Sequence, residues 1–194
     1  MPESPREIRI DYPEWVGKVV DWERDYPTDT ERMRLAIALA RENVERGTGG
    51  PFGAAVFAVG GGLVAIGVNS VVRLSNCALH AEMMAFMMAQ QRVGSFTLAA
   101  PGLPDHEMFA SCEPCAMCLG ATLWSGVCRV VYSARGEDAR ALGFDEGPVF
   151  PESHAYLASR GIRLEGGFLR EEARAVLARY RDLAGPVYNR IPGV

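Results

Sequence analysis

Lysine is almost absent from this sequence: of 20 basic residues, only Lys18 is a lysine and the others are arginines. Acidic residues number 24, so the formal net charge at pH 7 is −4. A protein that binds nucleic acid through its surface usually carries a basic patch or stripe. The charge balance of this chain therefore argues against a nucleic acid partner.

The sequence also lacks a targeting segment and a membrane-spanning run. Residues 1–30 are charged and interrupted by prolines, without the apolar run of a secretory signal. Residues 47–72 carry no charge, but they are rich in glycine, and three consecutive glycines at 60–62 indicate a turn between two strands. We expect a cytoplasmic protein with no membrane partner.

Disulfides are not expected either, because the cysteine count is an odd 5 and no secretory signal precedes them. Three of the cysteines form the run Cys112-x-x-Cys115-x-x-Cys118, and this spacing favours metal binding over disulfide bonds. We interpret Cys112 as a buried neighbour of a metal site, not as a ligand.

The chain is long enough for one domain with a sizeable core, since 48% of its 194 residues are hydrophobic. We expect an N-terminal extension at 1–27, packed on a domain at 28–194. A capping box at Thr28 and Glu31 predicts a first helix that ends at Gly47. Strands and helices then alternate, which predicts a layered α/β domain with helices covering the sheet. The predicted strands are 53–59, 63–69, 107–111, 127–132 and 162–165, and the later helices are 79–93, 115–124, 137–142, 153–159 and 170–183.

Two motifs, each at the start of a predicted helix, carry metal chemistry. They are His80-Ala81-Glu82 and Pro114-Cys115-Ala116-Met117-Cys118. One histidine and two cysteines give three ligands for Zn²⁺ and leave a fourth position open for water, as in catalytic sites. Glu82 is the acid/base that such a water needs. The order H-x-E followed by P-C-x-x-C is typical of zinc-dependent deaminases.

Each half of this pattern also has a simpler interpretation. A lone C-x-x-C often belongs to a structural zinc ribbon or a redox pair. A redox pair would leave His80 and Glu82 without a role, and a zinc-stabilised binding module without catalysis would not need Glu82. The two halves together favour a catalytic zinc site held by His80, Cys115 and Cys118.

On these motifs the chain resembles the cytidine-deaminase-like superfamily, and within it the bacterial guanine deaminases, over about residues 35–189. The matching stretches are Gly50-Pro51-Phe52-Gly53-Ala54, Asn69, Ser111 to Ala121, and Gly143-Phe144-Asp145-Glu146-Gly147-Pro148. The resemblance implies a three-layer α/β/α fold with a central mixed sheet, a zinc cofactor, and a homodimer that exchanges its C-terminal segments.

The same resemblance implies roles for residues outside the metal motifs. Asn69 would bind the base, and Glu146, supported by Asp145, would accept hydrogen bonds from two donors on one edge of guanine. Phe52 is a candidate for stacking on the ring, and Tyr188, with Tyr180 as an alternative, for closing the partner's pocket. Taken alone, Asp145 and Glu146 are better interpreted as a solvated turn and Phe52 as a core residue. Asn69 is equally readable as an ordinary turn residue, and Tyr188 and Tyr180 as packing on the last helix.

The expected function is hydrolytic deamination of guanine to xanthine and ammonia, with Glu82 and Glu146 as catalytic residues. Deamination of another base or of a guanine-like heterocycle such as ammeline, cytosine or a nucleoside is an alternative. A tRNA adenosine deaminase would share the zinc motif, but it would need a basic surface that this acidic chain does not indicate.

Overall fold

The computed structural model of the protein describes residues 7–189. The first six residues of the extension predicted at 1–27 and the last five of the domain predicted at 28–194 lie outside the described residues. Seven helices and five strands make up this described part. In chain order they are α1 Val16–Val19, α2 Asp29–Glu45, β1 Gly53–Ala58, β2 Leu63–Val68, α3 Ala81–Val93, β3 His106–Cys112, α4 Ala116–Ser125, β4 Arg129–Ala134, α5 Gly136–Arg140, α6 Pro151–Ser159, β5 Arg163–Gly166 and α7 Arg170–Asp182.

The strands form one mixed sheet in the order β2-β1-β3-β4-β5. β1 runs antiparallel to both β2 and β3, whereas β3, β4 and β5 are parallel to one another. The β1–β2 connection is a tight hairpin, and Gly60 in it has a φ of 71°, which favours glycine. The parallel strands are joined through helices, as parallel pairs require. The predicted mixed sheet is confirmed.

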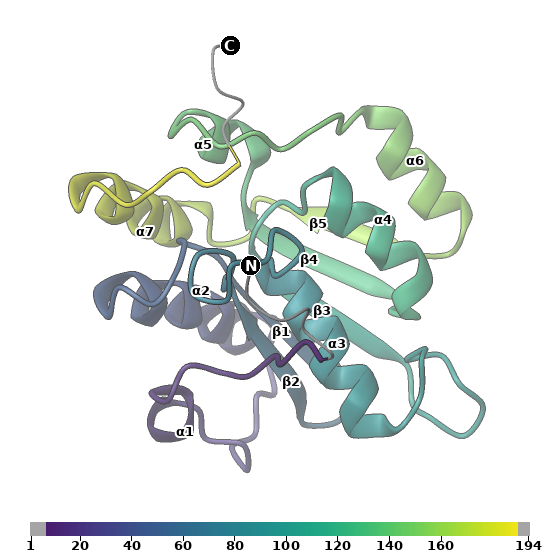
Figure 1. Cartoon of the computed structure of the whole chain (residues 1–194). Coiled ribbons are helices and arrows are strands. Elements are labelled where there is room, and N and C mark those ends of the chain that lie inside the picture. Colours follow the sequence, from purple (N-terminus) through teal and green to yellow (C-terminus); the bar gives the residue numbers. More distant parts are fainter. Residues whose placement is uncertain (1–6, 190–194) are drawn as a thin grey trace.

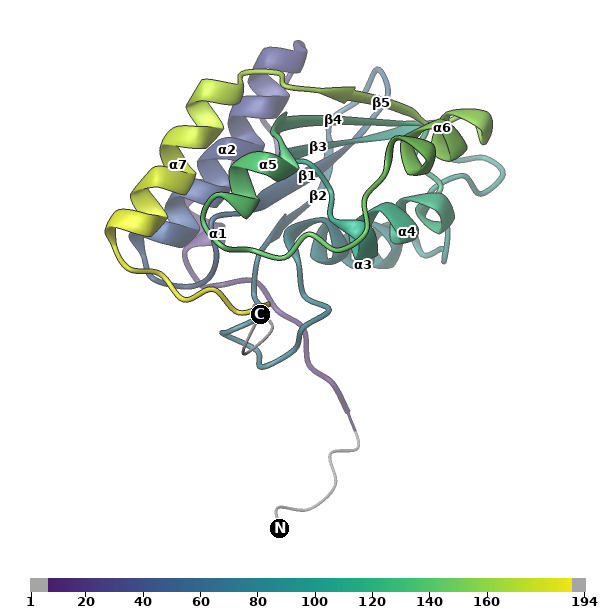
Figure 2. The same ribbon diagram turned by 90° about the horizontal axis from the view of Figure 1, so that it is seen from above.

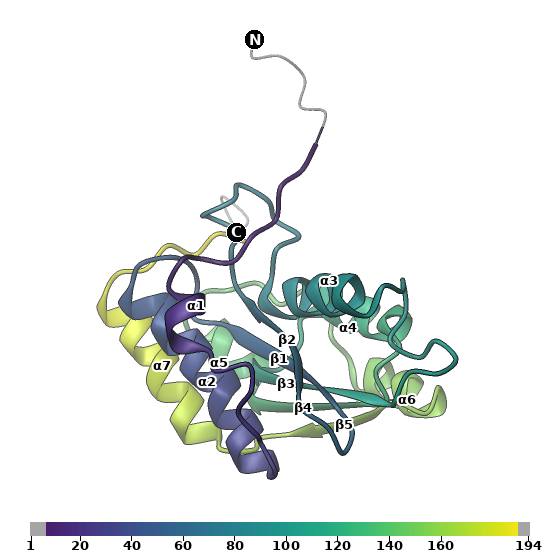
Figure 3. The same ribbon diagram turned by 90° about the horizontal axis from the view of Figure 1, so that it is seen from below.

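Helices cover both faces of this sheet. Figure 1 shows the sheet between two groups of helices, and the view from above separates them, with α2 and α7 on one side and α3 and α4 on the other (Figure 2). The view from below shows the same division and places α1 beside α2 (Figure 3). The predicted three-layer α/β/α fold is therefore confirmed.

Two strand glycines allow the helices to approach the sheet closely. A Cβ at Gly53 would lie 2.4 Å from the carbonyl oxygen of Ala36 in α2, and one at Gly67 would lie 1.9 Å from that of Ala81 in α3. Neither position accepts a larger residue without movement of a helix backbone. Gly67 thus seats the first turn of α3, directly after His80, on strand β2.

The N-terminal segment contributes side chains to the core under α2. Trp15, Val16, Val20 and Tyr26 are buried in the same hydrophobic cluster as Met33. The short helix α1 in this segment was not predicted, because four residues among prolines and charges show no helical periodicity. None of the helices in residues 7–189 combines the length and the apolar character needed to span a bilayer.

The predicted start of α2 is confirmed in detail. The Thr28 hydroxyl accepts the Glu31 backbone N–H, and the Glu31 carboxylate accepts the Thr28 N–H, so both halves of the capping box are present. The helix predicted at 79–93 begins two residues later, at Ala81, because His80 has extended backbone angles and serves as the N-cap. The other helices and strands differ from their predicted ends by one or two residues.

Candidate active site

The two sequence motifs meet where the N-termini of α3 and α4 converge. His80 is the N-cap residue of α3 and Cys115 is the N-cap residue of α4, while Cys118 lies in the first turn of α4. Exposed N–H groups and the helix dipole favour negative charge at such positions. The local sequence therefore places two cysteine sulfurs where thiolates are stabilised.

The three side chains fit a tetrahedral zinc ion. The Nδ1 atom of His80 lies 3.5 Å from Cys115 Sγ and 3.8 Å from Cys118 Sγ, and the three ligand atoms are within 4.8 Å of one another. Standard Zn–N and Zn–S bonds at tetrahedral angles place such N and S atoms about 3.6 Å apart. The donor set and its spacing thus match zinc, with His80 offering Nδ1.

The two sulfurs differ in their pKa values. Contacts with the Cys118 thiol and with His80 lower the pKa of Cys115 to about 4, against the effect of burial. The neighbouring Cys115 sulfur and burial raise the pKa of Cys118 well above its usual value. Without a cation only one sulfur is therefore a thiolate at neutral pH, whereas zinc takes both as thiolates.

Glu82 projects into the same cluster from the first turn of α3. Its side chain is buried, with 7% of the residue exposed. Burial and the negative charge at Cys115 raise the pKa of Glu82 to about 7, and a zinc ion at the three ligands would oppose this rise. A buried carboxylate beside the metal ligands is placed to accept and return a proton.

A second buried carboxylate, Glu146, faces the cluster from the loop between α5 and α6. The backbone carbonyl of Glu146 accepts the Ala116 N–H at 3.0 Å, which attaches this loop to the first turn of α4. Burial, followed by the charges at Cys115 and Glu82, raises the pKa of Glu146 to about 8, and a zinc ion at the three ligands would oppose this rise and favour the carboxylate. The site therefore holds two carboxyl groups with poor access to water beside the metal ligands.

Asn69 follows strand β2 and lies behind Tyr188. Its side chain has no exposed surface, and its Nδ2 donates a hydrogen bond of 2.7 Å to the Tyr188 hydroxyl. The Tyr188 ring meets His80 edge-on, with the ring centroids 6.1 Å apart. Tyr188 of the same chain thus stands between the predicted base-binding amide and the metal ligands.

Aromatic rings enclose the remaining space. Phe52 and Phe144 meet edge to face with centroids 5.1 Å apart, and Phe144 also contacts Tyr188 at 5.2 Å. The cavity that these rings share with His80 and Glu82 has a volume of only about 10 Å³. Pockets that hold small ligands measure about 300 Å³ or more. A base therefore enters this site only when part of the wall moves.

Asp145 does not line this cavity, although the sequence places it next to Glu146. It is exposed, and its carboxylate accepts the Gly147 N–H at 2.8 Å. The Asn189 side chain binds the Asp145 backbone on both sides, with its Oδ1 3.3 Å from the N–H nitrogen and its Nδ2 2.5 Å from the carbonyl oxygen. This geometry assigns Asp145 to the shape of the loop, while a contact with substrate stays a prediction.

Glu113, Phe144 and Asn189 also line the cavity, and sequence reasoning assigned none of them a role. One oxygen of Glu113 accepts the Gly136 N–H at 2.8 Å, and the other lies 3.3 Å from His154 Nε2. Glu113 thus joins the metal-ligand turn to α5 and α6. Its place directly before Pro114 and Cys115 is a sequence signal, whereas nothing local marked His154 or Asn189.

An α/β/α fold with one histidine and two cysteines beside a buried glutamate defines a zinc-dependent deaminase. Residues 27–134 match the sequence model of the cytidine and deoxycytidylate deaminase zinc-binding region. The chain therefore belongs to this family of zinc-dependent deaminases, and zinc is its cofactor.

Within the family the chain is similar to guanine deaminases. The guanine deaminase of Bacillus subtilis is 38% identical over 120 residues, which span 62% of this chain and 73% of that protein. A solved structure of guanine deaminase from Nitrosomonas europaea is 38% identical, with a TM-score of 0.87 over 92% of this chain and 98% of that one. A solved complex with 2,6-diaminopurine is 40% identical, with a TM-score of 0.88 over 94% and 97% of the two chains.

Proposed function

We propose that this protein hydrolyses guanine to xanthine and ammonia. The observation that carries the proposal is the second buried carboxylate, Glu146, which shares the cavity with Glu82 and His80. A deaminase needs one acid/base beside the metal, and a second one at that place requires a ligand that donates hydrogen bonds. Guanine has an N–H and an amino group on the same edge, and similarity to guanine deaminases supports this choice of base.

His80, Cys115 and Cys118 hold the zinc in this proposal. When bound, zinc supplies the Lewis acidity that activates water toward the amino-bearing carbon of the base. Glu82 removes a proton from the attacking water and returns it to a ring nitrogen. It then delivers a second proton to the departing amino group, so that the products are xanthine and ammonia.

Glu146 orients the base in this scheme. Its carboxylate accepts the ring N–H and one amino hydrogen, and its position in a water-poor cavity strengthens both bonds. It also lies where a proton can pass to the leaving amine. Asn69 supplies a donor and an acceptor to the opposite part of the base, and Phe52 contributes a flat apolar wall.

Access to the site depends on the segment that carries Tyr188. Its hydroxyl accepts a hydrogen bond from the Asn69 amide, and its ring lies against His80 and Phe144. A bound base replaces Tyr188 as the partner of Asn69, and the segment then closes over the ligand. In a homodimer with exchanged C-terminal segments, the same tyrosine would come from the partner subunit.

We also propose a homodimer and a cytoplasmic location. Trp124 on α4 is 76% exposed and Met117, on the same face of that helix, is 37% exposed, which is typical of an apolar surface covered by a partner. The five cysteines are all free, and thiolate zinc ligands suit a reducing compartment. The mass measured by light scattering during size-exclusion chromatography tests the dimer.

The function is tested by measuring ammonia release from guanine, guanosine, adenine, cytosine, cytidine and ammeline with zinc-loaded protein. Release from guanine well above the others supports the proposal. Release from another base without guanine turnover keeps the zinc chemistry and removes the role given to Glu146. If none of the six compounds releases ammonia, the proposal is contradicted and a tRNA substrate is favoured, although a net charge of −4 does not indicate one.

A further inference from the structure

A chain of hydrogen bonds connects the N-terminal segment with Asn69. The Trp15 indole N–H donates to the Thr48 hydroxyl at 3.0 Å, and that hydroxyl donates to Asn43 Oδ1 at 2.7 Å. The Asn43 Nδ2 then donates to two backbone carbonyls, those of Gly50 and Asn69, both at 2.9 Å. Three of these four bonds thus lead from an indole ring before α2 to the residue predicted to bind the base, and the fourth reaches Gly50.

The direction of every bond in this chain follows from its two ends, an indole N–H that can only donate and two carbonyls that can only accept. An indole N–H can only donate, so the Thr48 hydroxyl accepts from Trp15 and offers its own hydrogen onward. That hydrogen requires an oxygen, which assigns the Oδ1 of Asn43 to Thr48 and turns both amide hydrogens of Asn43 toward the carbonyls. The two carbonyls can only accept, so they fix the orientation of the Asn43 amide, and the Thr48 hydroxyl oriented by Trp15 completes the hydrogen bonds of that amide.

The carbonyls that Asn43 holds belong to the two segments that flank the cavity. Gly50 begins the turn that carries Phe52, and Asn69 ends strand β2; the Asn69 N–H in turn donates to the Phe52 carbonyl at 3.1 Å. Asn43 has no exposed surface. A buried amide that bonds two loops at once sets their spacing, because unpaired carbonyls at this depth are costly.

The backbone at Gly49 packs closely against these bonds. A Cβ at Gly49 would lie 1.9 Å from the Asn69 carbonyl oxygen and 2.7 Å from Asn43 Nδ2. Trp15 is 5% exposed and is enclosed in the core. A shift of the Asn43 amide is therefore transmitted to the Asn69 backbone and to the side chain that meets Tyr188.

We propose that Trp15, Thr48 and Asn43 form a positioning relay that holds Asn69 in register with the base, and that this is a function of the N-terminal segment. The inference rests on the proposed function, since it gives Asn69 its ligand. Trp15 precedes residues 27–134, the part of the chain that matches the deaminase family model. The relay thus adds a support for base recognition from outside the catalytic region.

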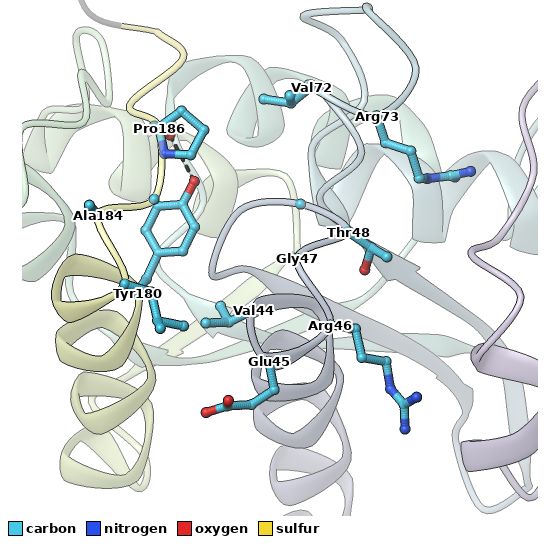
Figure 4. A pocket seen from close by; sticks show the side chains of 13 residues that line it. Val44, Glu45, Arg46, Gly47, Thr48, Val72, Arg73, Tyr180, Ala184 and Pro186 are labelled. Atoms are coloured by element: carbon cyan, nitrogen blue, oxygen red, sulfur yellow. Dashed lines mark hydrogen bonds between the residues drawn. The ribbon is translucent and has the colours of Figure 1, made fainter.

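Thr48 offers the sharpest test, because it is the middle of the relay and lies at the wall of a separate groove of about 640 Å³ (Figure 4). Thr48→Val keeps the shape and removes the hydroxyl, and Thr48→Ser keeps the hydroxyl. We expect Thr48→Val and Trp15→Phe to raise KM for guanine about fivefold with kcat within about twofold, as for loss of one net hydrogen bond. Thr48→Ser should restore KM.

Trp22→Phe is the matched control, because Trp22 lies in the same N-terminal segment and its indole has no hydrogen-bond partner within residues 7–189. An unchanged KM in Thr48→Val, or an equal change in Trp22→Phe, overturns the relay while wild-type turnover of guanine still supports the proposed function. No turnover of guanine by the wild type overturns the function instead.

A readout that needs no turnover keeps the two outcomes separate. Crystal structures of wild type and Thr48→Val, compared at Asn43 and Asn69, test the relay directly. A shifted Asn43 side chain with a displaced Asn69 side chain supports it. An unmoved Asn69 overturns it, whatever the substrate of the protein is.

Discussion

The Asn69 side chain donates a hydrogen bond of 2.7 Å to the hydroxyl of Tyr188, 119 residues away in the sequence. Both groups are largely shielded from water, and Tyr188 lies next to the metal ligand His80. The C-terminal segment is therefore bonded to the residue expected to recognise the base. The same hydrogen bond thus holds Tyr188 over the cavity and holds the Asn69 amide in place.

Tyr188→Phe removes this bond and leaves a buried amide donor without its partner. We expect the free energy of unfolding in urea to fall by ~1–2 kcal/mol, because an unsatisfied buried donor costs about that much. KM for guanine should not rise, since the base itself pairs with Asn69. Tyr156→Phe, at a tyrosine that is 56% exposed, is the control. Unchanged stability in Tyr188→Phe would mean that the bond is absent in solution.

Glu82→Gln keeps the size of the side chain and removes its ability to carry a proton. We expect ammonia release from guanine to fall by about 10²–10⁴-fold, the usual contribution of general acid/base catalysis. Zinc content by mass spectrometry and the melting temperature should stay near wild type, because Glu82 is not a ligand. Glu152→Gln, at an exposed glutamate of α6, controls for loss of a nearby charge. Wild-type turnover in Glu82→Gln would contradict the assignment.

Glu146→Gln tests the carboxylate from the loop between α5 and α6. We expect kcat/KM for guanine to fall by about 100-fold, because two charge-assisted hydrogen bonds to the base are weakened or reversed. Zinc content should be unchanged. Steady-state kinetics with guanine decide the matter, and a change of less than threefold would assign Glu146 to the loop alone.

Cys118→Ala removes one of the three zinc ligands. We expect the purified variant to contain less than about a tenth of the wild-type zinc and to melt at a lower temperature, since bound metal stabilises only the folded state. A chelator should lower the melting temperature of the wild type and leave the variant unchanged. Cys128→Ala, at a partly buried cysteine outside the cluster, should retain zinc. Full zinc content in Cys118→Ala would exclude Cys118 from the ligand set.

Asp138 ties α5 to α7 and gives the stability of the fold a dependence on pH. Hydrogen bonds from Arg170 hold the pKa of its carboxyl below the usual value, and the side chain is only 9% exposed. Because the fold favours the carboxylate, this stabilisation is present above the unfolded pKa of about 3.9 and is lost as pH falls through the lower folded pKa.

We therefore expect Asp138→Asn to lower the free energy of unfolding at pH 7 by ~1 kcal/mol. The difference from wild type should shrink as the pH is lowered toward 3. Denaturant titrations at several pH values measure both curves. A difference that is constant with pH would mean that the carboxylate charge does not contribute.

Much of the fold was predictable because its signals are local. The capping box at Thr28, the glycine turn at 60–62 and the alternation of strands with helices placed the elements within one or two residues of their observed ends. Helix α1 is different. Its four residues are held by Trp15 and Val16 in a core made by other parts of the chain, so their own sequence shows no periodicity.

The candidate site divides in the same way. His80, Glu82, Cys115 and Cys118 were predicted because spacing along two helix starts determines which side chains point to one ion. The family and its zinc are confirmed by the comparisons, whereas the roles of Glu82, Asn69, Phe52, Asp145, Glu146 and Tyr188 stay predictions. Of these residues, Asp145 alone lies away from the site: the others line the cavity beside His80 and Cys115, except Asn69, which is hydrogen-bonded to Tyr188 in that cavity wall.

The sequence by itself determined the order of helices and strands and the deaminase family, and it predicted the metal ligands and the acid/base beside them. These depend on residues a few positions apart, whose geometry the helix and the turn prescribe. Only the tertiary structure decided that Tyr188 is hydrogen-bonded to Asn69, that Asn189 binds the Asp145 backbone, and that Trp15 is connected through Thr48 to Asn43. Such contacts join distant segments, and they form only when packing of the whole core brings donors and acceptors within about 3 Å of one another.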